Sequence, residues 1–146
     1  MNIKKVTLVA LLLFSFSVMG IAEKNSESKS TYNWEPLIAA LMQVESNGNS
    51  KAKNGNQIGA LQITPILVKE CNQILQKRGS SKRFTLQDRL SVEKSKEMFV
   101  VFQSYHNPSN DLEYAIRSWN GGPRFSRRAT QNYFNKVMRY YKKTDA

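Results

Sequence analysis

The chain has 146 residues, and 40% of them are hydrophobic, which is enough for one buried core in a single domain. It contains one cysteine and one histidine, so an intramolecular disulfide framework and a zinc site built from Cys and His clusters are both excluded. A net charge of +11 favours association with a polyanion.

The first 22 residues have the pattern of a cleavable secretory signal. Lys4 and Lys5 precede the apolar run 6–14, and small residues end the segment at Ala22. An uncleaved membrane anchor is the alternative, but the apolar run is short for a membrane span. We therefore expect an exported protein of the periplasm or cell envelope, with no transmembrane segment after signal cleavage.

A polar stretch separates this signal from the folded part of the chain. Residues 23–31 (EKNSESKST) carry no hydrophobic side chain and are expected to form a flexible spacer, so the domain is expected to span residues 32–146. Removing residues 1–22 leaves 20 basic and 11 acidic residues, a net charge of +9. Cell-wall polymers that carry carboxylates fit this charge at least as well as nucleic acid, and a solvated basic face without a ligand is the alternative.

Apolar periodicity predicts an all-α domain of about six helices. The spacing of apolar residues predicts the first helix over 34–46, and Gly and Asn residues predict a loop over 47–57. Thr64 followed by Pro65 predicts the start of a helix that ends near Lys77.

The second half of the domain is predicted from its capping residues. A short helical turn is expected at 85–88, and Ser91 is expected to cap a helix that reaches His106. The run 98–102 is apolar on all sides, which indicates a central buried helix. Asn110 and Glu113 predict a capping box for the next helix, and the last helix is expected over 129–142.

Glu45 is the candidate catalytic residue, because it ends the apolar face of the first predicted helix. Burial disfavours the charged form of a carboxyl group and raises its pKa, and a Glu that holds its proton near neutral pH can act as a general acid. The alternative is that Glu45 closes the helix at its solvent end. Cys71 lies on an apolar stripe and is expected to be buried, and nothing near His106 in the sequence suggests a nucleophilic pair.

Four separated segments together resemble the lytic transglycosylases with a lysozyme-like fold. Glu45-Ser46 resembles the catalytic Glu-Ser of that family, and residues 59–63 (GALQI) are similar to its Gly-Leu-Met-Gln segment. Residues 118–122 (SWNGG) resemble its Tyr-Asn-Ala-Gly segment, and residues 130–137 (TQNYFNKV) resemble its closing helix. The four segments occur in the family's order.

This resemblance implies the fold, the site and the substrate. It implies a lysozyme-like domain that acts on peptidoglycan glycan strands, with Glu45 as the catalytic acid. The substrate-binding residues that it implies are Ser46, Gln62, Trp119, Asn120 and Tyr133. Trp119 replaces the usual Tyr of the family, which keeps an aromatic platform and loses a hydroxyl. Trp119 and Tyr133 also lie on apolar stripes, so core packing is the alternative for both.

The distribution of acidic residues favours a reaction with one carboxylate. Ordinary glycoside hydrolysis uses two carboxylates across the scissile bond. After Glu45, the next acid is Glu70, which lies in no matching motif. The resemblance then implies cleavage of the β-1,4 bond between N-acetylmuramic acid and N-acetylglucosamine, with a 1,6-anhydromuramic acid product and Glu45 acting first as acid and then as base. No metal or other cofactor is expected.

Two alternatives come with this interpretation. A lysozyme-type muramidase would hydrolyse the same bond. A non-catalytic wall-binding accessory of an envelope secretion or conjugation apparatus belongs to a different class, and such an apparatus is also an alternative partner of the enzyme. Nucleic acid is not an expected partner, because the sequence carries an export signal and no recognition motif.

Overall fold

The computed structural model describes residues 32–144. The predicted signal peptide (1–22) and spacer (23–31) lie outside the described residues and stay predictions. Within residues 32–144 the chain forms five α-helices, one 3-10 helix and two short strands. In chain order these are α1 (Glu35–Ser46), β1 (Lys53–Asn54), β2 (Gln57–Ile58), α2 (Pro65–Lys77), η1 (Leu86–Leu90), α3 (Val92–His106), α4 (Leu112–Gly121) and α5 (Gln131–Thr144). The predicted all-α class is confirmed.

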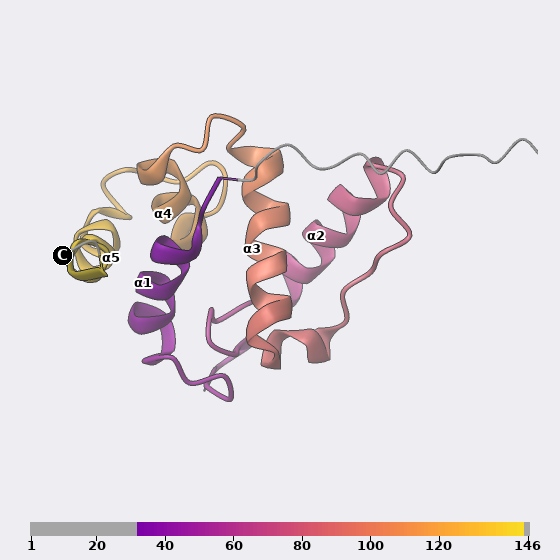
Figure 1. Cartoon of the computed structure of the whole chain (residues 1–146), viewed down its shortest axis with the longest axis horizontal. Coiled ribbons are helices and arrows are strands. Elements are labelled where there is room, and N and C mark those ends of the chain that lie inside the picture. The colour runs from indigo at the N-terminus through magenta and orange to yellow at the C-terminus, as the bar shows by residue number, and fades with distance from the viewer. Residues whose placement is uncertain (1–31, 145–146) are drawn as a thin grey trace, which may run out of the picture. The chain divides into compact units, whose positions relative to one another are not determined.

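Helix α3 is the central helix, as its apolar run predicts. Figure 1 shows α3 standing between α2 on one side and α1, α4 and α5 on the other. Met98, Phe99 and Phe102 on α3 are buried and belong to one core with buried side chains of α1, α4 and α5. A core to which all five α-helices contribute, α2 included, fixes the relative positions of the side chains at their ends.

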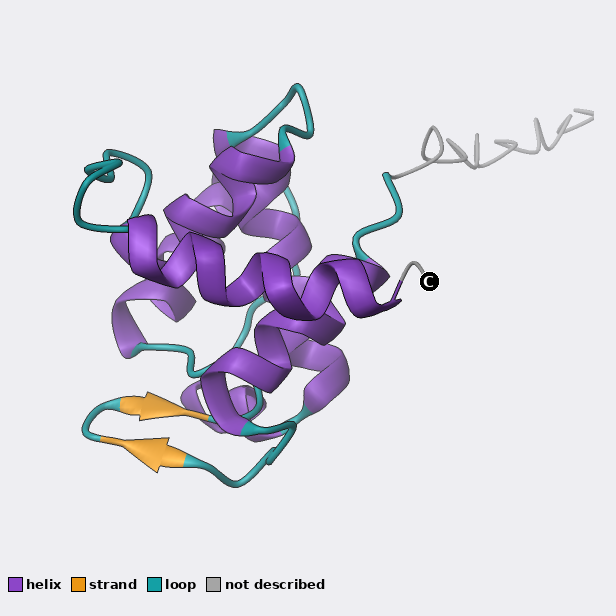
Figure 2. Cartoon of the chain, turned by 90° about the vertical axis from the view of Figure 1, so that its left-hand side faces the viewer, coloured by secondary structure: helices purple, strands orange, loops and turns teal. Residues whose placement is uncertain are grey.

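Helix α5 lies across the two other helices that carry family motifs, α1 with Glu45-Ser46 and α4 with residues 118–121. It packs against α1 and against α4, and Figure 2 shows it crossing in front of them toward the C label. Val137 is its fully buried residue, while the other aromatic and apolar side chains of its inner face are half-buried. This packing brings residues of α5 next to residues of α1 that are almost ninety positions earlier in the chain.

Most of the predicted helix caps are present. The Thr64 hydroxyl accepts a hydrogen bond from the Leu67 N–H at 3.2 Å, and Ser91 caps α3 in the same way. The predicted capping box of Asn110 and Glu113 is wrong, because the cap of α4 is Asp111. An N-cap residue has extended backbone geometry, which Asp111 adopts, whereas Asn110 lies in the left-handed region at φ 55°.

A short β-hairpin occupies the loop expected over 47–57. Strands β1 and β2 are antiparallel, with Lys53 opposite Ile58 and Asn54 opposite Gln57, and the hairpin lies at the lower edge of Figure 2. Each strand has two residues, and none of them is buried. So short a pair has no alternation of apolar and polar residues, and periodicity therefore did not predict it.

Cys71 is fully buried, as its place on an apolar stripe predicts. Its thiol donates to the Met98 carbonyl at 3.4 Å, and burial raises the pKa of the thiol to about 12. A thiol in this setting packs like a small apolar group and does not act as a nucleophile.

None of the helices in the described part of the chain is long and apolar enough to span a membrane.

Candidate active site

A cleft of about 470 Å³ lies where the ends of several elements meet. The last turn of α1, the β1–β2 hairpin, the first turns of α2, the end of α4 and the first turns of α5 all contribute lining residues. Five of the six residues predicted for the site line this cleft: Glu45, Gln62, Trp119, Asn120 and Tyr133. The sixth, Ser46, is not among the lining residues.

Glu45 and Tyr133 form the tightest polar contact in the cleft. Glu45 lies in the last turn of α1, and the left-handed Asn47 ends that helix two residues later. The Tyr133 hydroxyl on α5 donates a hydrogen bond of 2.5 Å to Glu45 Oε1. An O–H···O⁻ bond of this length is typical of a strong, charge-assisted contact with a carboxylate.

The surroundings of Glu45 favour its protonated form. Burial raises the pKa of its carboxyl group, and the Tyr133 hydrogen bond and the positive charge of Lys136 reduce that rise without cancelling it. The pKa of Tyr133 lies far above its ordinary value, because the phenol is buried and faces the Glu45 carboxylate. Tyr133 therefore keeps its proton and serves as a permanent hydrogen-bond donor to Glu45.

Gln62 presents a carbonyl oxygen to the cleft. Its backbone is in the left-handed region at φ 50°, and its side-chain Nε2 donates to the Gly59 carbonyl at 2.9 Å and to the Ala52 carbonyl at 3.3 Å. These bonds fix the amide against the loop and leave Oε1 without a protein partner among residues 32–144. No buried side-chain oxygen of these residues lacks a partner, so Gln62 Oε1 is open to solvent in the cleft.

Gly59 allows this loop to lie against η1. Its backbone has φ +86°, and a Cβ atom there would lie 1.8 Å from the Arg89 carbonyl oxygen. No side chain fits between two stretches of backbone that approach so closely. A glycine is therefore required at the start of the segment that positions Gln62.

Trp119 and Asn120 line the cleft from the end of α4. The Trp119 ring packs against Phe99 at 5.1 Å and Phe102 at 6.1 Å between ring centroids, so its inner side belongs to the core. The ring is half-buried and also lines the cleft, so core packing and contact with substrate are compatible roles for Trp119. Asn120 is exposed, and its side-chain amide makes no hydrogen bond to another of residues 32–144.

Ser46 ties the end of α1 to the loop beneath the cleft. Its hydroxyl lies 2.8 Å from the Ala60 carbonyl and 3.2 Å from the Met42 carbonyl, and its single hydrogen is directed at these acceptors. This arrangement holds Glu45 next to the segment that carries Gln62. Binding of substrate by Ser46 stays a prediction.

The cleft also contains residues that sequence reasoning missed. Glu70 lines it from α2, and its carboxylate lies 2.7 Å from His106 Nε2. Ile66 also lines it and is 74% exposed, an unusual exposure for a large apolar side chain. Lys136 lies one turn after Tyr133 on α5. Glu70 follows Leu67 by three positions and thus shares the edge of the α2 apolar stripe, which is the one signal that could have indicated it.

The described residues thus form a helical domain in which a half-buried carboxyl group, bound by a tyrosine at the end of a helix, faces a cleft lined by amides and an aromatic ring. The chain matches the family model of the transglycosylase SLT domain over residues 23–142, and it belongs to this family. Neither the curated proteins nor the solved structures compared with the chain gave a match. Membership supports a peptidoglycan lytic transglycosylase type of function in general and implies a peptidoglycan substrate.

Proposed function

We propose that the protein is a peptidoglycan lytic transglycosylase that cleaves the β-1,4 bond between N-acetylmuramic acid and N-acetylglucosamine. The observation that carries this proposal is the Glu45–Tyr133 pair in the cleft. Burial favours the proton on Glu45, and the 2.5 Å hydrogen bond from Tyr133 stabilises the carboxylate that remains after the proton has been transferred. A group that must give and then take a proton needs both forms within reach.

In the first step Glu45 donates its proton to the oxygen of the scissile bond. The bond between C1 of the muramic acid and this oxygen breaks, the N-acetylglucosamine leaves with a free hydroxyl, and positive charge develops at C1. The N-acetyl group of the muramic acid stabilises that charge in place of a second carboxylate. The Glu45 carboxylate is held by Tyr133 and faces the positive charge of Lys136.

In the second step the Glu45 carboxylate takes the proton from the C6 hydroxyl of the muramic acid. The C6 oxygen attacks C1 and closes the 1,6-anhydro ring, so no water is consumed and Glu45 regains its proton. Because both reacting groups belong to one sugar, positioning supplies a large part of the acceleration. Gln62 Oε1 and Asn120 are placed to hold the sugar amides and hydroxyls, and Trp119 is placed to pack against a ring.

The proposed substrate also gives a location. Peptidoglycan lies outside the cytoplasm, and the first 22 residues have the pattern of an export signal. We propose that the protein works in the periplasm or cell envelope, on its own or as part of a secretion or conjugation apparatus that must pass the wall.

Product analysis tests the reaction. Purified protein is incubated with peptidoglycan, the released muropeptides are separated, and their masses are determined, with Glu45→Gln as the matched inactive control. We expect muropeptides that end in 1,6-anhydromuramic acid, which are lighter by one water than reducing ends. Equal wall clearance by wild type and Glu45→Gln would show that Glu45 is not catalytic. Clearance by neither would also contradict catalysis by Glu45 and would favour a wall-binding accessory.

Glu70 supports hydrolysis as the second candidate. Its carboxylate lines the same cleft, and a hydrolase uses a second carboxylate to activate water or to form a covalent intermediate. Under this alternative the products carry reducing muramic ends, and Glu70→Gln abolishes their formation. Anhydro products from both wild type and Glu70→Gln would exclude it.

A further inference from the structure

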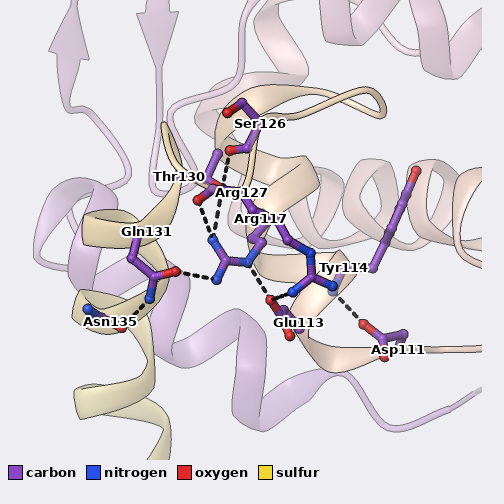
Figure 3. Close-up of polar contacts among 9 residues, drawn as sticks. All are labelled: Asp111, Glu113, Tyr114, Arg117, Ser126, Arg127, Thr130, Gln131 and Asn135. Atoms are coloured by element: carbon purple, nitrogen blue, oxygen red, sulfur yellow. Dashed lines mark hydrogen bonds and ion pairs between the residues drawn. The ribbon is translucent and has the colours of Figure 1, made fainter.

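A buried arginine lies behind the cleft, where α4 meets the start of α5. Arg117 is 3% exposed, and it precedes Trp119 by two residues on α4. Figure 3 shows its guanidinium at the centre of a group of polar side chains from α4, from the loop that follows it and from the beginning of α5. A buried guanidinium is costly unless each of its donors is satisfied, so its partners indicate what it holds.

The partners of Arg117 lie mainly at the start of α5. Nη1 donates to the Arg127 carbonyl at 2.9 Å and to the Thr130 hydroxyl at 3.1 Å. Nη2 donates to Gln131 Oε1 at 2.8 Å, and the guanidinium lies over the Phe134 ring, 4.5 Å from its centroid. The guanidinium therefore contacts the loop that leads into α5, the first turn of α5 and an aromatic side chain of α5.

Glu113 compensates the charge of this arginine. Its carboxylate lies 2.7 Å from Nε of Arg117, which follows it by one helical turn on α4, and 2.6 Å from Arg127 Nη1. Glu113 is the last acidic residue before Asp145, so it is the acid that this part of the chain supplies to a cluster of basic groups. With Glu113 in place, each of the three guanidinium nitrogens of Arg117 has at least one hydrogen-bond acceptor.

The contacts of Arg117 surround Tyr133 in the sequence. Thr130, Gln131 and Phe134 lie within three positions of Tyr133, and the first turn of α5 sets where its ring points. The Tyr133 hydroxyl reaches Glu45 Oε1 at 2.5 Å, a bond that a small rotation of α5 would break. Arg117 thus connects the helix that carries Trp119 and Asn120 with the helix that carries the hydrogen-bond donor of Glu45.

We propose that Arg117 is a positioning residue, whose guanidinium locks the first turn of α5 to α4 and so holds the Tyr133 hydroxyl on the Glu45 carboxyl group. The effect on catalysis rests on the proposed function, whereas the geometric part does not. The planar fork matters because it reaches a carbonyl, a hydroxyl, an amide and a carboxylate at fixed angles, which a lysine ammonium on a flexible stem does not do.

The direct test is the pKa of Glu45, measured by NMR titration of the glutamate side-chain carboxyl carbons in labelled protein. The groups that lower this pKa are Tyr133 and Lys136, both on α5. If Arg117→Met releases the first turn of α5, Glu45 loses the Tyr133 bond, and its pKa rises in the same direction as in Tyr133→Phe. In Arg117→Met/Tyr133→Phe the second change then adds no further rise.

Three controls separate positioning from charge and from loss of stability. Arg117→Lys keeps the charge and loses the fork, and we expect it to show most of the rise. Arg127→Gln removes an exposed charge from the same cluster and leaves the Arg127 carbonyl in place, and we expect no rise. Asn72→Ala removes two hydrogen bonds to the Phe84 backbone, away from the cleft, and we expect lower stability with an unchanged Glu45 pKa.

Kinetics supply a second readout for the same variants. We expect kcat of Arg117→Met to fall about tenfold to a hundredfold, as small displacements of catalytic groups do, with a smaller change in KM. If Arg117→Met does not fold, Gln131→Ala removes one acceptor from exposed α5 surface and should give a smaller rise of the Glu45 pKa. An unchanged Glu45 pKa in folded Arg117→Met, or in Gln131→Ala where Arg117→Met does not fold, overturns the positioning role, and so does a wild-type value in Arg117→Lys. Because the titration needs no turnover, it reports on Arg117 even if product analysis contradicts the proposed reaction.

Discussion

Two carboxylates line the cleft, and each has an aromatic partner. Glu45 accepts a hydrogen bond of 2.5 Å from the Tyr133 phenol, and Glu70 lies 2.7 Å from the His106 imidazole. The Glu45 pair joins α1 to α5, and burial has the largest influence on the pKa of Glu45. The Glu70 pair joins α2 to α3 near the surface, where the Glu70 side chain is 30% exposed and the His106 ring packs against Phe102.

The difference between the partners separates the two carboxylates chemically. The Tyr133 phenol offers Glu45 a hydrogen bond without a positive charge, whereas the partner of Glu70 is an imidazole. Burial raises the pKa of Glu45, and the Tyr133 hydrogen bond and the charge of Lys136 reduce that rise without cancelling it. The pair that cannot form an ion pair is therefore the one suited to hold and return a proton.

The strongest test of this difference between Glu45 and Glu70 is to neutralise each carboxylate in turn. We expect Glu45→Gln to lower kcat about a thousandfold or more, because general acid–base catalysis contributes about 10²–10⁴-fold and Glu45 serves in both steps. Glu70→Gln should stay within about tenfold of wild type. Release of soluble muropeptides measures both, and circular dichroism checks that the variants fold. Equal losses in the two variants would contradict the assignment of roles.

Loss of the Tyr133 hydrogen bond should have the next largest effect. Tyr133→Phe removes the donor that stabilises the Glu45 carboxylate, so the pKa of Glu45 rises and the alkaline limb of the pH–rate profile moves to higher pH. At the pH optimum we expect kcat to fall about tenfold to a hundredfold, since the acid loses its orientation and the base its stabilisation. A limb that moves to lower pH would show that Tyr133 does not act through the carboxylate.

The burial of Glu45 also predicts a pH-dependent stability. Its folded-state pKa is raised above the ordinary value of 4.5, so the stability it provides is complete below that value and is lost as the pH rises through the folded-state pKa. At neutral pH, Glu45→Gln should therefore be more stable than wild type by about 1 kcal/mol in free energy of unfolding, which raises the melting temperature by a few degrees. At acidic pH we expect no gain in stability. Thermal denaturation at the two pH values measures this, and a gain of equal size at both would exclude the carboxylate as its cause.

The smallest effect concerns Lys136. Its positive charge lowers the pKa of Glu45 at longer range than the Tyr133 bond does, and the pKa should rise slightly in Lys136→Gln. We expect a shift of the alkaline limb in the same direction as in Tyr133→Phe but smaller, and high salt should reduce the difference from wild type. Lys142→Gln removes an exposed charge from the same helix and serves as the matched control. A shift in Lys136→Gln larger than in Tyr133→Phe would reverse the order of the two contributions.

The helices were predictable because local chemistry determines them. Thr64-Pro65 and Ser91 mark helix starts that the structure keeps, and the run 98–102 indicates the central helix. Asn110 and Asp111 are both good capping residues, and the choice between them depends on a backbone turn from Asn107 to Asn110 that no local pattern shows. The hairpin depends on pairing between residues that are not buried, which periodicity cannot detect.

The residues predicted for the site are those that family motifs mark. Glu45 combines a place on an apolar stripe with a family motif, and the structure puts it in the cleft with Tyr133. Glu70 and Arg117 lie in no motif, and their roles depend on which helix faces which. Arg117 follows two apolar residues in the sequence of α4, and nothing there indicates that the start of α5 would supply its acceptors.

The buried thiol of Cys71 can report how often the fold opens locally. With no exposure to solvent and its sulfur directed at the Met98 carbonyl, this thiol cannot meet a reagent while α2 and α3 remain packed together. The rate at which a thiol-specific dye labels the protein therefore measures how often α2 and α3 separate. Every variant discussed above carries Cys71, so the opening of the helix pair can be measured without introducing a cysteine by mutation.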